Sequence, residues 1–187
     1  MLDDSVFEDM RLRTEEFFRH SHHDKTHVQR VYNLALRLAK EERADVDVVK
    51  AAVLLHDIAR AMEDEGKIED HAEESARMAK RILENVGFPP QKALRVIHCI
   101  RVHRFRKGER AETLEARILQ DADRLDILGA IGIARVFARG GWSNMPLYDP
   151  SIPPKKKYDG KSLTSVNHLC EKILKAKDAM NTIAGKR

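Results

Sequence analysis

Cysteine is scarce in this chain of 187 residues. Cys99 and Cys170 are the only two, they lie far apart, and they form no CxxC pair. This excludes a disulfide-stapled scaffold and a cysteine-based zinc finger, and it is typical of a reduced protein with a cytoplasmic location. No apolar run approaches the ~20 residues that a spanning helix needs, so no membrane partner is expected. The first ten residues, MLDDSVFEDM, are acidic and amphipathic, unlike a signal peptide.

Aromatic residues are also few, at 5% of the chain, and they are not interleaved with basic residues. Nucleic acid is therefore not favoured as a partner. Charged residues of both signs make up 34%, and the net charge of +4 is a mild bias toward small acidic ligands. The sequence does not decide whether the chain forms a homo-oligomer.

Strand-like alternation is missing as well, and apolar residues recur at three and four positions almost throughout. This spacing predicts an all-α single domain over 1–187, an α-helical bundle of six or seven helices with its core at about 20–138. The expected helices include 46–62, one from Asp70 toward 86, one from Pro89 to about 106, and 111–138 with a kink at Gly129 or Gly132. A final amphipathic helix is expected over 163–182.

Glycine, proline and lysine are concentrated in residues 139–162, RGGWSNMPLYDPSIPPKKKYDGKS, before the last helix. So long a loop is either a mobile surface connection or a functional segment. In the second case it would be a flap over a site, with Lys155, Lys156 and Lys157 available for anionic groups.

His56 and Asp57 stand side by side in the otherwise apolar run AAVLLHDIARA. A buried aspartate without a partner costs several kcal/mol. An arginine ion pair, a hydrogen-bonded histidine or a metal ion would each offset that cost. The dipeptide alone does not decide among the three.

Other metal-competent side chains are expected on inward faces. His27 precedes Val31 by four residues, on the apolar stripe of its helix, and Asp123 follows Leu119 by four. Two imidazoles and two carboxylates suit a borderline divalent ion such as Mn, Fe, Co, Ni or Zn.

Two further aspartates follow on the same expected helix. Asp126 leans toward the apolar side. Asp121 lies four residues from Arg117 and three from Arg124, a pattern typical of a solvated face.

The ordered set His27, His56-Asp57 and Asp123 resembles the HD superfamily of metal-dependent phosphohydrolases. The surrounding segments are similar to a branch of single-domain HD hydrolases of bacteria and archaea: DKTHVQRVYNLALRLAKEE, AAVLLHDIAR, ILQDADRLDILGAIGIARVFARGG and NHLCEKILKAKDAMNT. The resemblance covers most of the chain. It implies an HD-domain helical bundle with one divalent metal ion (Mn, Fe, Co, Ni, Zn or Mg) held by His27, His56, Asp57 and Asp123.

The chemistry that this implies is attack of an activated water on a phosphorus atom. Asp57 could orient that water instead of, or as well as, ligating the ion. Asp126 is a candidate catalytic base, or an acceptor for a metal-bound histidine.

HD enzymes with two metals use further histidines between the HD pair and the last aspartate, an interval that here holds His71, His98 and His103. Candidates for phosphate or a second metal are Arg30, Arg60, His71, His103 and Lys172. Alternatively, His71 simply starts a helix and His103 is an ordinary residue in a basic helix with a solvated face.

Two other histidine-containing stretches are less informative. Helical spacing places His168 and Lys172 on an exposed side, although the resemblance includes their stretch and suggests a substrate or structural role. His20, His22 and His23 are expected in an exposed segment before a helix.

The expected function is hydrolysis of a small phosphorylated substrate, with a nucleotide favoured, at a phosphomonoester, phosphodiester or pyrophosphate bond. An HD-fold di-iron oxygenase is the alternative within enzymes. A non-enzymatic nucleotide-sensing module is the alternative outside them, although degenerate modules of that kind usually lack one or more metal ligands.

Overall fold

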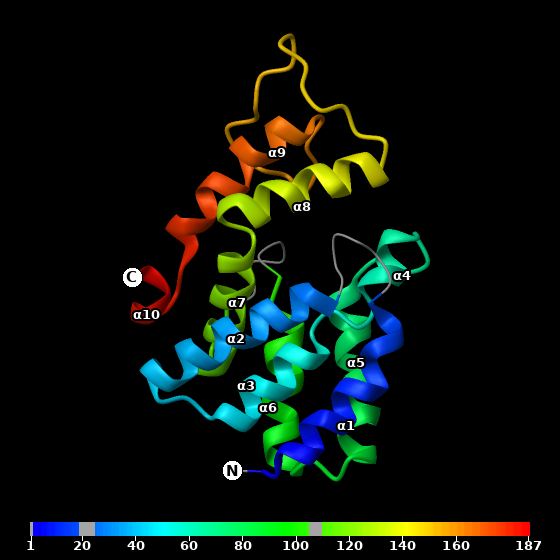
Figure 1. The fold of residues 1–187 in the computed structure, drawn as a ribbon, viewed down its shortest axis with the longest axis vertical. Helices are drawn as coiled ribbons and strands as arrows, with labels where there is room; N and C mark the ends of the chain where they lie inside the picture. The colour runs from blue at the N-terminus through cyan, green and yellow to red at the C-terminus, as the bar shows by residue number, and fades with distance from the viewer. Residues whose placement is uncertain (1, 19–24, 105–109) are drawn as a thin grey trace.

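The structure is a computed structural model that describes residues 2–18, 25–104 and 110–187 (Figure 1). The expectations for His20, His22 and His23 lie outside these residues. The helices are α1 (Asp4–Thr14), α2 (Lys25–Glu42), α3 (Val46–Leu55), α4 (Arg60–Asp64), α5 (His71–Asn85), α6 (Pro90–Val102), α7 (Leu114–Asp126), α8 (Gly129–Trp142), α9 (Ser165–Glu171) and α10 (Ile183–Lys186). Short 3-10 helices cover Glu15–Phe17 and Ile173–Ala179. The described residues form no strand, which confirms the predicted all-α fold. Among them, no helix has both the length and the apolar character needed to cross a membrane.

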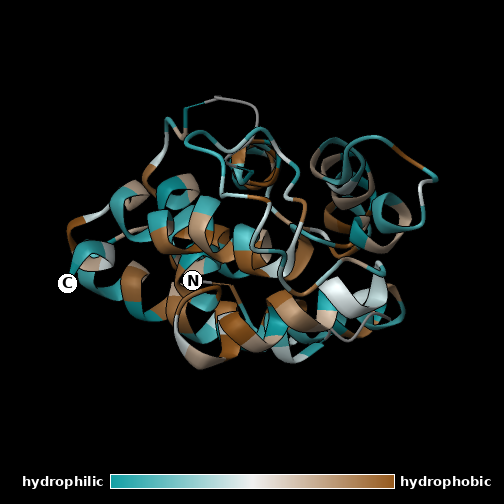
Figure 2. Ribbon diagram, turned by 90° about the horizontal axis from the view of Figure 1, so that it is seen from above, coloured by the Kyte–Doolittle hydropathy of each residue, from teal (hydrophilic) through white to brown (hydrophobic). Residues whose placement is uncertain are grey.

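The core lies among α2, α3, α5, α6 and α7, which pack against one another. Leu55, Ile100, Ile118 and Leu119 are fully buried there. Most helices carry hydrophobic and hydrophilic residues side by side (Figure 2), so each buries one face and exposes another. Side-chain caps fix helix starts: Asp70, where the helix is predicted to begin, accepts hydrogen bonds from the backbone N–H groups of Ala72 and Glu73 in the first turn of α5.

The helix predicted over 46–62 is interrupted. α3 ends at Leu55, residues 56–59 form a turn, and α4 begins at Arg60. The backbone N–H of Arg60 bonds to the carbonyl of Asp57 at 2.9 Å, and that of Ala59 bonds to Ser75 Oγ at 3.1 Å. His56 and Asp57 thus lie in a hydrogen-bonded turn at the end of a buried helix.

The helix predicted over 111–138 is also two helices. α7 ends at Asp126, and α8 begins at Gly129, whose φ of +68° is the left-handed conformation that glycine adopts without strain. A Cβ on Gly132 would lie 1.8 Å from the carbonyl oxygen of Ile127, so only glycine fits where the chain turns back on itself. In Figure 1, α8 crosses over the end of α7.

Gly132→Ala is therefore expected to lower the free energy of unfolding by about 2–3 kcal/mol, because backbone must move to relieve the overlap. Gly141→Ala is the matched control in the same helix, since no atom of the described residues lies within 4 Å of the added Cβ. That control should gain about 0.5–1 kcal/mol from helix propensity. Urea unfolding of both variants measures the difference, and equal stability of the two would refute the steric argument.

The C-terminal part departs further from the sequence prediction. Residues 139–142 belong to α8, and the predicted helix over 163–182 is divided into α9 and the 3-10 segment Ile173–Ala179, with α10 beginning only after it. The intervening loop is held in place by Glu171, which is buried and accepts hydrogen bonds from Lys155 N at 2.8 Å and Ser162 Oγ at 2.6 Å. Lys155 of the lysine run pairs with Asp159 rather than with the metal-competent residues.

The expectation that Asp121 faces solvent is wrong. Its side chain is fully buried, and its carboxylate accepts hydrogen bonds from the backbone N–H groups of Asn181 and Thr182, both at 2.8 Å. The C-terminal segment folds back over α7 and brings these donors to it. Spacing to Arg117 and Arg124 could not reveal contacts with residues so distant in the sequence.

Candidate metal centre

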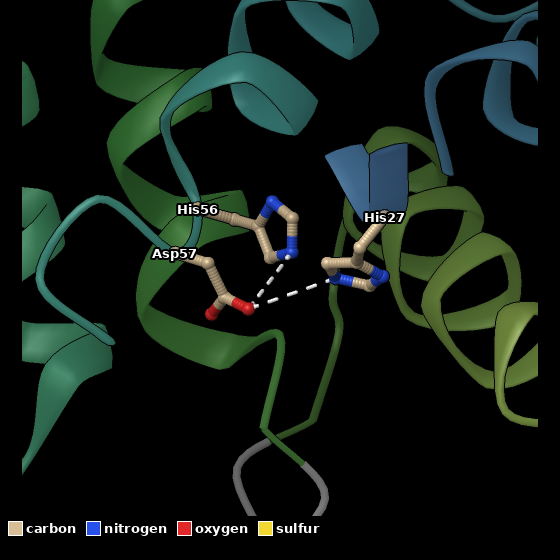
Figure 3. Close-up of side chains that lie close together, drawn as sticks. All are labelled: His27, His56 and Asp57. Atoms are coloured by element: carbon tan, nitrogen blue, oxygen red, sulfur yellow. Dashed lines mark ion pairs between the residues drawn. The ribbon is translucent and has the colours of Figure 1, made fainter. Parts of the chain in front are cut away.

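Imidazoles from separate parts of the chain converge on the carboxylate of Asp57 (Figure 3). His27 lies in the first turn of α2, and His56 and Asp57 lie in the turn after α3. Asp57 Oδ2 is 3.5 Å from His56 Nε2 and 3.8 Å from His27 Nε2. Asp123 of α7 joins them, with Oδ1 at 3.7 Å from His27 Nε2. The structure thus brings His27, His56 and Asp57 together, with Asp123, the fourth ligand that the resemblance implies, beside His27.

A second pair of imidazoles faces the other oxygen of the same carboxylate. Asp57 Oδ1 lies 3.1 Å from His71 Nε2 and 3.4 Å from His103 Nε2. The two Nε2 atoms of His71 and His103 are 3.2 Å apart. His71 begins α5 and His103 follows α6, so Asp57 joins two groups of three metal-competent side chains, one on each oxygen.

All four imidazoles present the same nitrogen to the centre. His56 Nδ1 contacts the carbonyl of Val53 at 2.8 Å, and His103 Nδ1 contacts that of Ile100 at 2.6 Å. The Nδ1 atoms of His27 and His71 contact the carboxylates of Asp126 and Glu63 respectively. Carbonyls and carboxylates only accept, so each Nδ1 carries a proton, and in the neutral imidazole the lone pair that can ligate a cation is on Nε2.

The centre therefore gathers lone pairs and carboxylate oxygens in a buried space, an arrangement that repels itself unless a cation is present. His56 Nε2 is buried and has no hydrogen-bond partner among the described residues. Unlike the other residues of the centre, Asp123 is partly exposed, with 31% of its side chain accessible, so it lies where the centre opens to solvent. This donor set of imidazole nitrogens and carboxylate oxygens fits a divalent transition metal.

Electrostatics at the centre follow from the same contacts. Burial would raise the pKa of Asp57, but the surrounding imidazoles of His56, His103, His27 and His71 hold that pKa well below its ordinary value. Burial likewise opposes protonation of His27, yet the hydrogen bond to Asp126 and the nearby carboxylate of Asp57 raise its pKa. The carboxylate at the heart of the cluster is thus ionised and ready to hold a cation.

Behind His27, Asp126 acts as an anchor. It accepts hydrogen bonds from His27 Nδ1 at 2.8 Å, Arg30 Nε at 2.5 Å and Arg135 Nη1 at 2.5 Å. Although burial opposes ionisation, these three partners lower the pKa of Asp126 to about 2. A carboxylate so engaged is poorly suited to act as a base and well suited to orient an imidazole. Arg30, predicted to contact phosphate, points to Asp126.

Behind His71, Glu63 plays the corresponding part. Its carboxylate contacts His71 Nδ1 and receives two hydrogen bonds from Arg104, both at 3.0 Å, and its pKa falls to about 2 despite the opposing effect of burial. Arg60, predicted to contact phosphate, lies 3.3 Å from His71 Nδ1 and pairs with Asp64 at 3.1 Å.

Sequence reasoning missed Glu63 and Arg135, and for the basic stretch around Arg104 it favoured a solvated face over a phosphate-binding rim. The polar run AMEDEGK around Glu63 looked like ordinary surface. Arg135 did carry a signal, because it is a lone charge inside the apolar run GAIGIARVFA, the same anomaly that drew attention to His56-Asp57.

On the last helices, His168 and Lys172 are half-buried rather than exposed, so the spacing argument about them is wrong. Lys172 has no carboxylate within ion-pair distance among the described residues.

Comparison with known proteins places these residues in a family context. A model of the HD domain matches residues 25–128 of the chain. The uncharacterized protein YpgQ of Bacillus subtilis is 36% identical over 166 residues, which cover 87% of this chain and 73% of that protein.

Solved structures agree with this match. A protein of Lactobacillus plantarum superposes with a TM-score of 0.83 at 31% identity, covering 100% of this chain and 89% of that one. An HD-superfamily hydrolase of Bacillus thuringiensis superposes with a TM-score of 0.73 at 34% identity, covering 98% and 86%. YpgQ in complex with ADP superposes with a TM-score of 0.72 at 30% identity, covering 96% and 86%. Since the matched residues 25–128 include all the side chains that converge on Asp57, the chain belongs to the HD domain family.

Proposed function

We propose that the protein is a metal-dependent phosphohydrolase that acts on a small phosphorylated metabolite, with a nucleotide as the favoured substrate. The observation that carries the proposal is the common orientation of four imidazoles, each with Nδ1 held by an acceptor and Nε2 turned toward Asp57. Purely structural histidines have no reason to share this arrangement. Membership of a family that includes an HD-superfamily hydrolase supports the same reading.

Each residue has a defined task in this proposal. His27, His56, Asp57 and Asp123 hold a divalent ion, which when bound lowers the pKa of a water molecule and stabilises charge on phosphoryl oxygens. Asp57 Oδ1, His71 and His103 would hold a second ion; alternatively, His71 and His103 protonated at Nε2 would donate to a phosphoryl oxygen. Asp126 and Glu63 fix the orientation of His27 and His71 from behind.

Asp123 lies at the mouth of the centre, where it can take a hydrogen bond from the attacking water. The nucleotide is favoured for a separate reason. YpgQ of Bacillus subtilis has a crystal structure in complex with ADP, and it is 36% identical to this chain.

Turnover of a substrate panel is the direct test. The panel contains nucleoside mono-, di- and triphosphates, a cyclic nucleotide and a simple phosphomonoester, each with Mn or Co added. Phosphate and pyrophosphate release are measured separately to identify the bond that breaks. We expect turnover that depends on the added metal and disappears with EDTA, whereas absence of hydrolysis across the panel would rule the proposal out.

One observation favours a second candidate function. The group Asp57, His71 and His103 adjoins the first group and shares its carboxylate, as a centre with two irons would require. An HD-fold di-iron oxygenase would contain two irons per chain after purification in air and would show no phosphohydrolase activity. Iron counting beside the substrate panel therefore separates the two enzymes.

A further inference from the structure

Arg135 of α8 reaches the residues that lie behind the metal centre. Its side chain is 13% exposed, and its Nη1 donates a hydrogen bond to Asp126 Oδ2 at 2.5 Å. The same oxygen accepts the hydrogen bond from His27 Nδ1 at 2.8 Å. One oxygen of a buried carboxylate therefore joins a guanidinium of α8 to the imidazole of α2.

The other guanidinium at this carboxylate comes from the same helix as the imidazole. Arg30 donates to Asp126 from Nε to Oδ1 at 2.5 Å and from Nη2 to Oδ2 at 3.1 Å. It lies on α2, three residues after His27, so a shift of that helix carries the guanidinium and the imidazole together. Arg135 lies on α8 and does not follow such a shift. It therefore holds the carboxylate from an element other than the one that carries the imidazole.

The sequence of α8 brings Arg135 into this position. Gly132 lets the helix fold back against the end of α7, because a Cβ there would overlap the carbonyl of Ile127. Arg139, one turn beyond Arg135, lies on the same face and pairs with the buried carboxylate of Asp64 at 2.6 Å. Only two residues of α8 are buried, and both are glycines. Paired arginines, rather than fully buried apolar side chains, thus connect α8 to the elements around the centre.

The same arrangement recurs on the other side of the centre. Glu63 Oε2 accepts a hydrogen bond from His71 Nδ1 and another from Arg104 Nη1, and the three residues lie in α4, in α5 and after α6. His56 and His103 differ, because their Nδ1 atoms bond to backbone carbonyls of the preceding helix. A helix holds its own carbonyls in place, whereas a carboxylate turns about its side-chain bonds. An arginine therefore accompanies the imidazole where the acceptor is a side chain.

On this basis, and resting on the metal centre of the proposed function, we propose that Arg135 is a positioning residue that fixes the Asp126 carboxylate and thereby the ring of His27. With Oδ1 held from α2 and Oδ2 held from α8, the carboxylate keeps one orientation. The imidazole bonded to it then keeps Nε2 directed into the centre. Arg135 acts on metal binding through Asp126, without ligating the ion itself.

NMR of the full chain, freed of metal with a chelator, reports the His27 Nδ1–H proton directly. Bonded to a buried acceptor, this proton should exchange slowly with water and give its own signal in wild type. Arg135→Gln should broaden or remove the signal, because the carboxylate of Asp126 gains freedom to turn. Arg139→Gln is the matched control on the same helix, since its partner is Asp64, and it should leave the signal as in wild type. An unchanged signal in Arg135→Gln, or equal loss in both variants, would overturn the proposal.

Calorimetry with Mn²⁺ tests the consequence for metal binding. Arg135→Gln should weaken binding roughly tenfold, and Arg135→Lys, which keeps the charge and one donor, should recover part of the loss. In the Asp126→Asn background, Arg135→Gln should weaken binding by less than about twofold, because the residue through which it acts is already altered. Arg37→Gln, an exposed arginine that pairs with Glu41, should bind Mn²⁺ like wild type. An equal effect of Arg135→Gln in both backgrounds would show that it does not act through Asp126.

Turnover data keep this inference distinguishable from the proposed function. With limiting Mn²⁺, Arg135→Gln should lower turnover, and saturating Mn²⁺ should restore most of it. If wild type binds Mn²⁺ but hydrolyses nothing in the substrate panel, the proposed function fails, and the Mn²⁺ affinities still decide the role of Arg135. If wild type turns substrate over while Arg135→Gln matches it in Mn²⁺ affinity and in the His27 signal, the inference about Arg135 alone fails.

Discussion

Asp57→Asn is expected to remove bound metal and to lower turnover by about a thousand-fold or more, which corresponds to several kcal/mol of lost charge stabilisation. The reason is its central place: one oxygen faces His27 and His56, and the other faces His71 and His103. Asparagine keeps the shape of the side chain but brings an uncharged amide into both groups. Metal content by mass spectrometry, measured beside kcat and the thermal unfolding midpoint, checks this expectation on folded protein.

Two further variants show whether the loss of metal is specific to Asp57. Asp126→Asn should still accept the hydrogen bond from His27 Nδ1, yet lose the negative charge that polarises the ring, so metal affinity should fall about 10- to 100-fold without vanishing. Asp178→Asn is the control on an exposed carboxylate and should match wild type in metal content and rate. Retention of full metal content and turnover by Asp57→Asn would show that the cluster is not the metal site.

Much of this centre could be predicted because its residues break a local pattern. His56 and Asp57 are titratable groups in a buried apolar run, and helical spacing alone turns His27 and Asp123 inward. In a small helical bundle, a side chain on the apolar face of one helix packs against the apolar faces of the neighbouring helices. Convergence of these side chains therefore follows from period and burial, without knowledge of the tertiary structure.

Partners distant in the sequence could not be predicted in this way. Arg30 was expected at phosphate, but it binds Asp126, 96 residues further along the chain. Arg60 was expected there too, yet it pairs with Asp64, an i,i+4 contact that helical spacing could have indicated. A kink at Gly129 or Gly132 was expected, but the full break between α7 and α8 was not, because the close approach of Gly132 to the carbonyl of Ile127 appears only in the folded chain. A charged side chain whose partner is distant in the sequence looks like a surface residue when only the sequence is considered.

Asp121 is the strongest example of such a residue, and Asp121→Ala is expected to lower the free energy of unfolding by about 3–5 kcal/mol. Its carboxylate accepts hydrogen bonds from the backbone of Asn181 and Thr182, from both of their side chains and from Arg124. Alanine would leave two backbone N–H groups and a buried guanidinium without this acceptor. A Cβ on Gly185 would lie 2.6 Å from Asp121 Oδ2, which shows how closely the C-terminal segment approaches.

Urea unfolding should show this loss as a lower midpoint, and thermal unfolding should show a fall of about 10 °C. Asp121→Asn keeps one oxygen in place and should lose roughly half as much, whereas Asp178→Ala on the exposed side of the same C-terminal region should lose almost nothing. Because Asp121 and Asp123 lie on one helix but face different partners, Asp121→Ala should leave metal affinity close to wild type at temperatures where the protein stays folded. A variant as stable as wild type would mean that the C-terminal segment does not depend on this carboxylate.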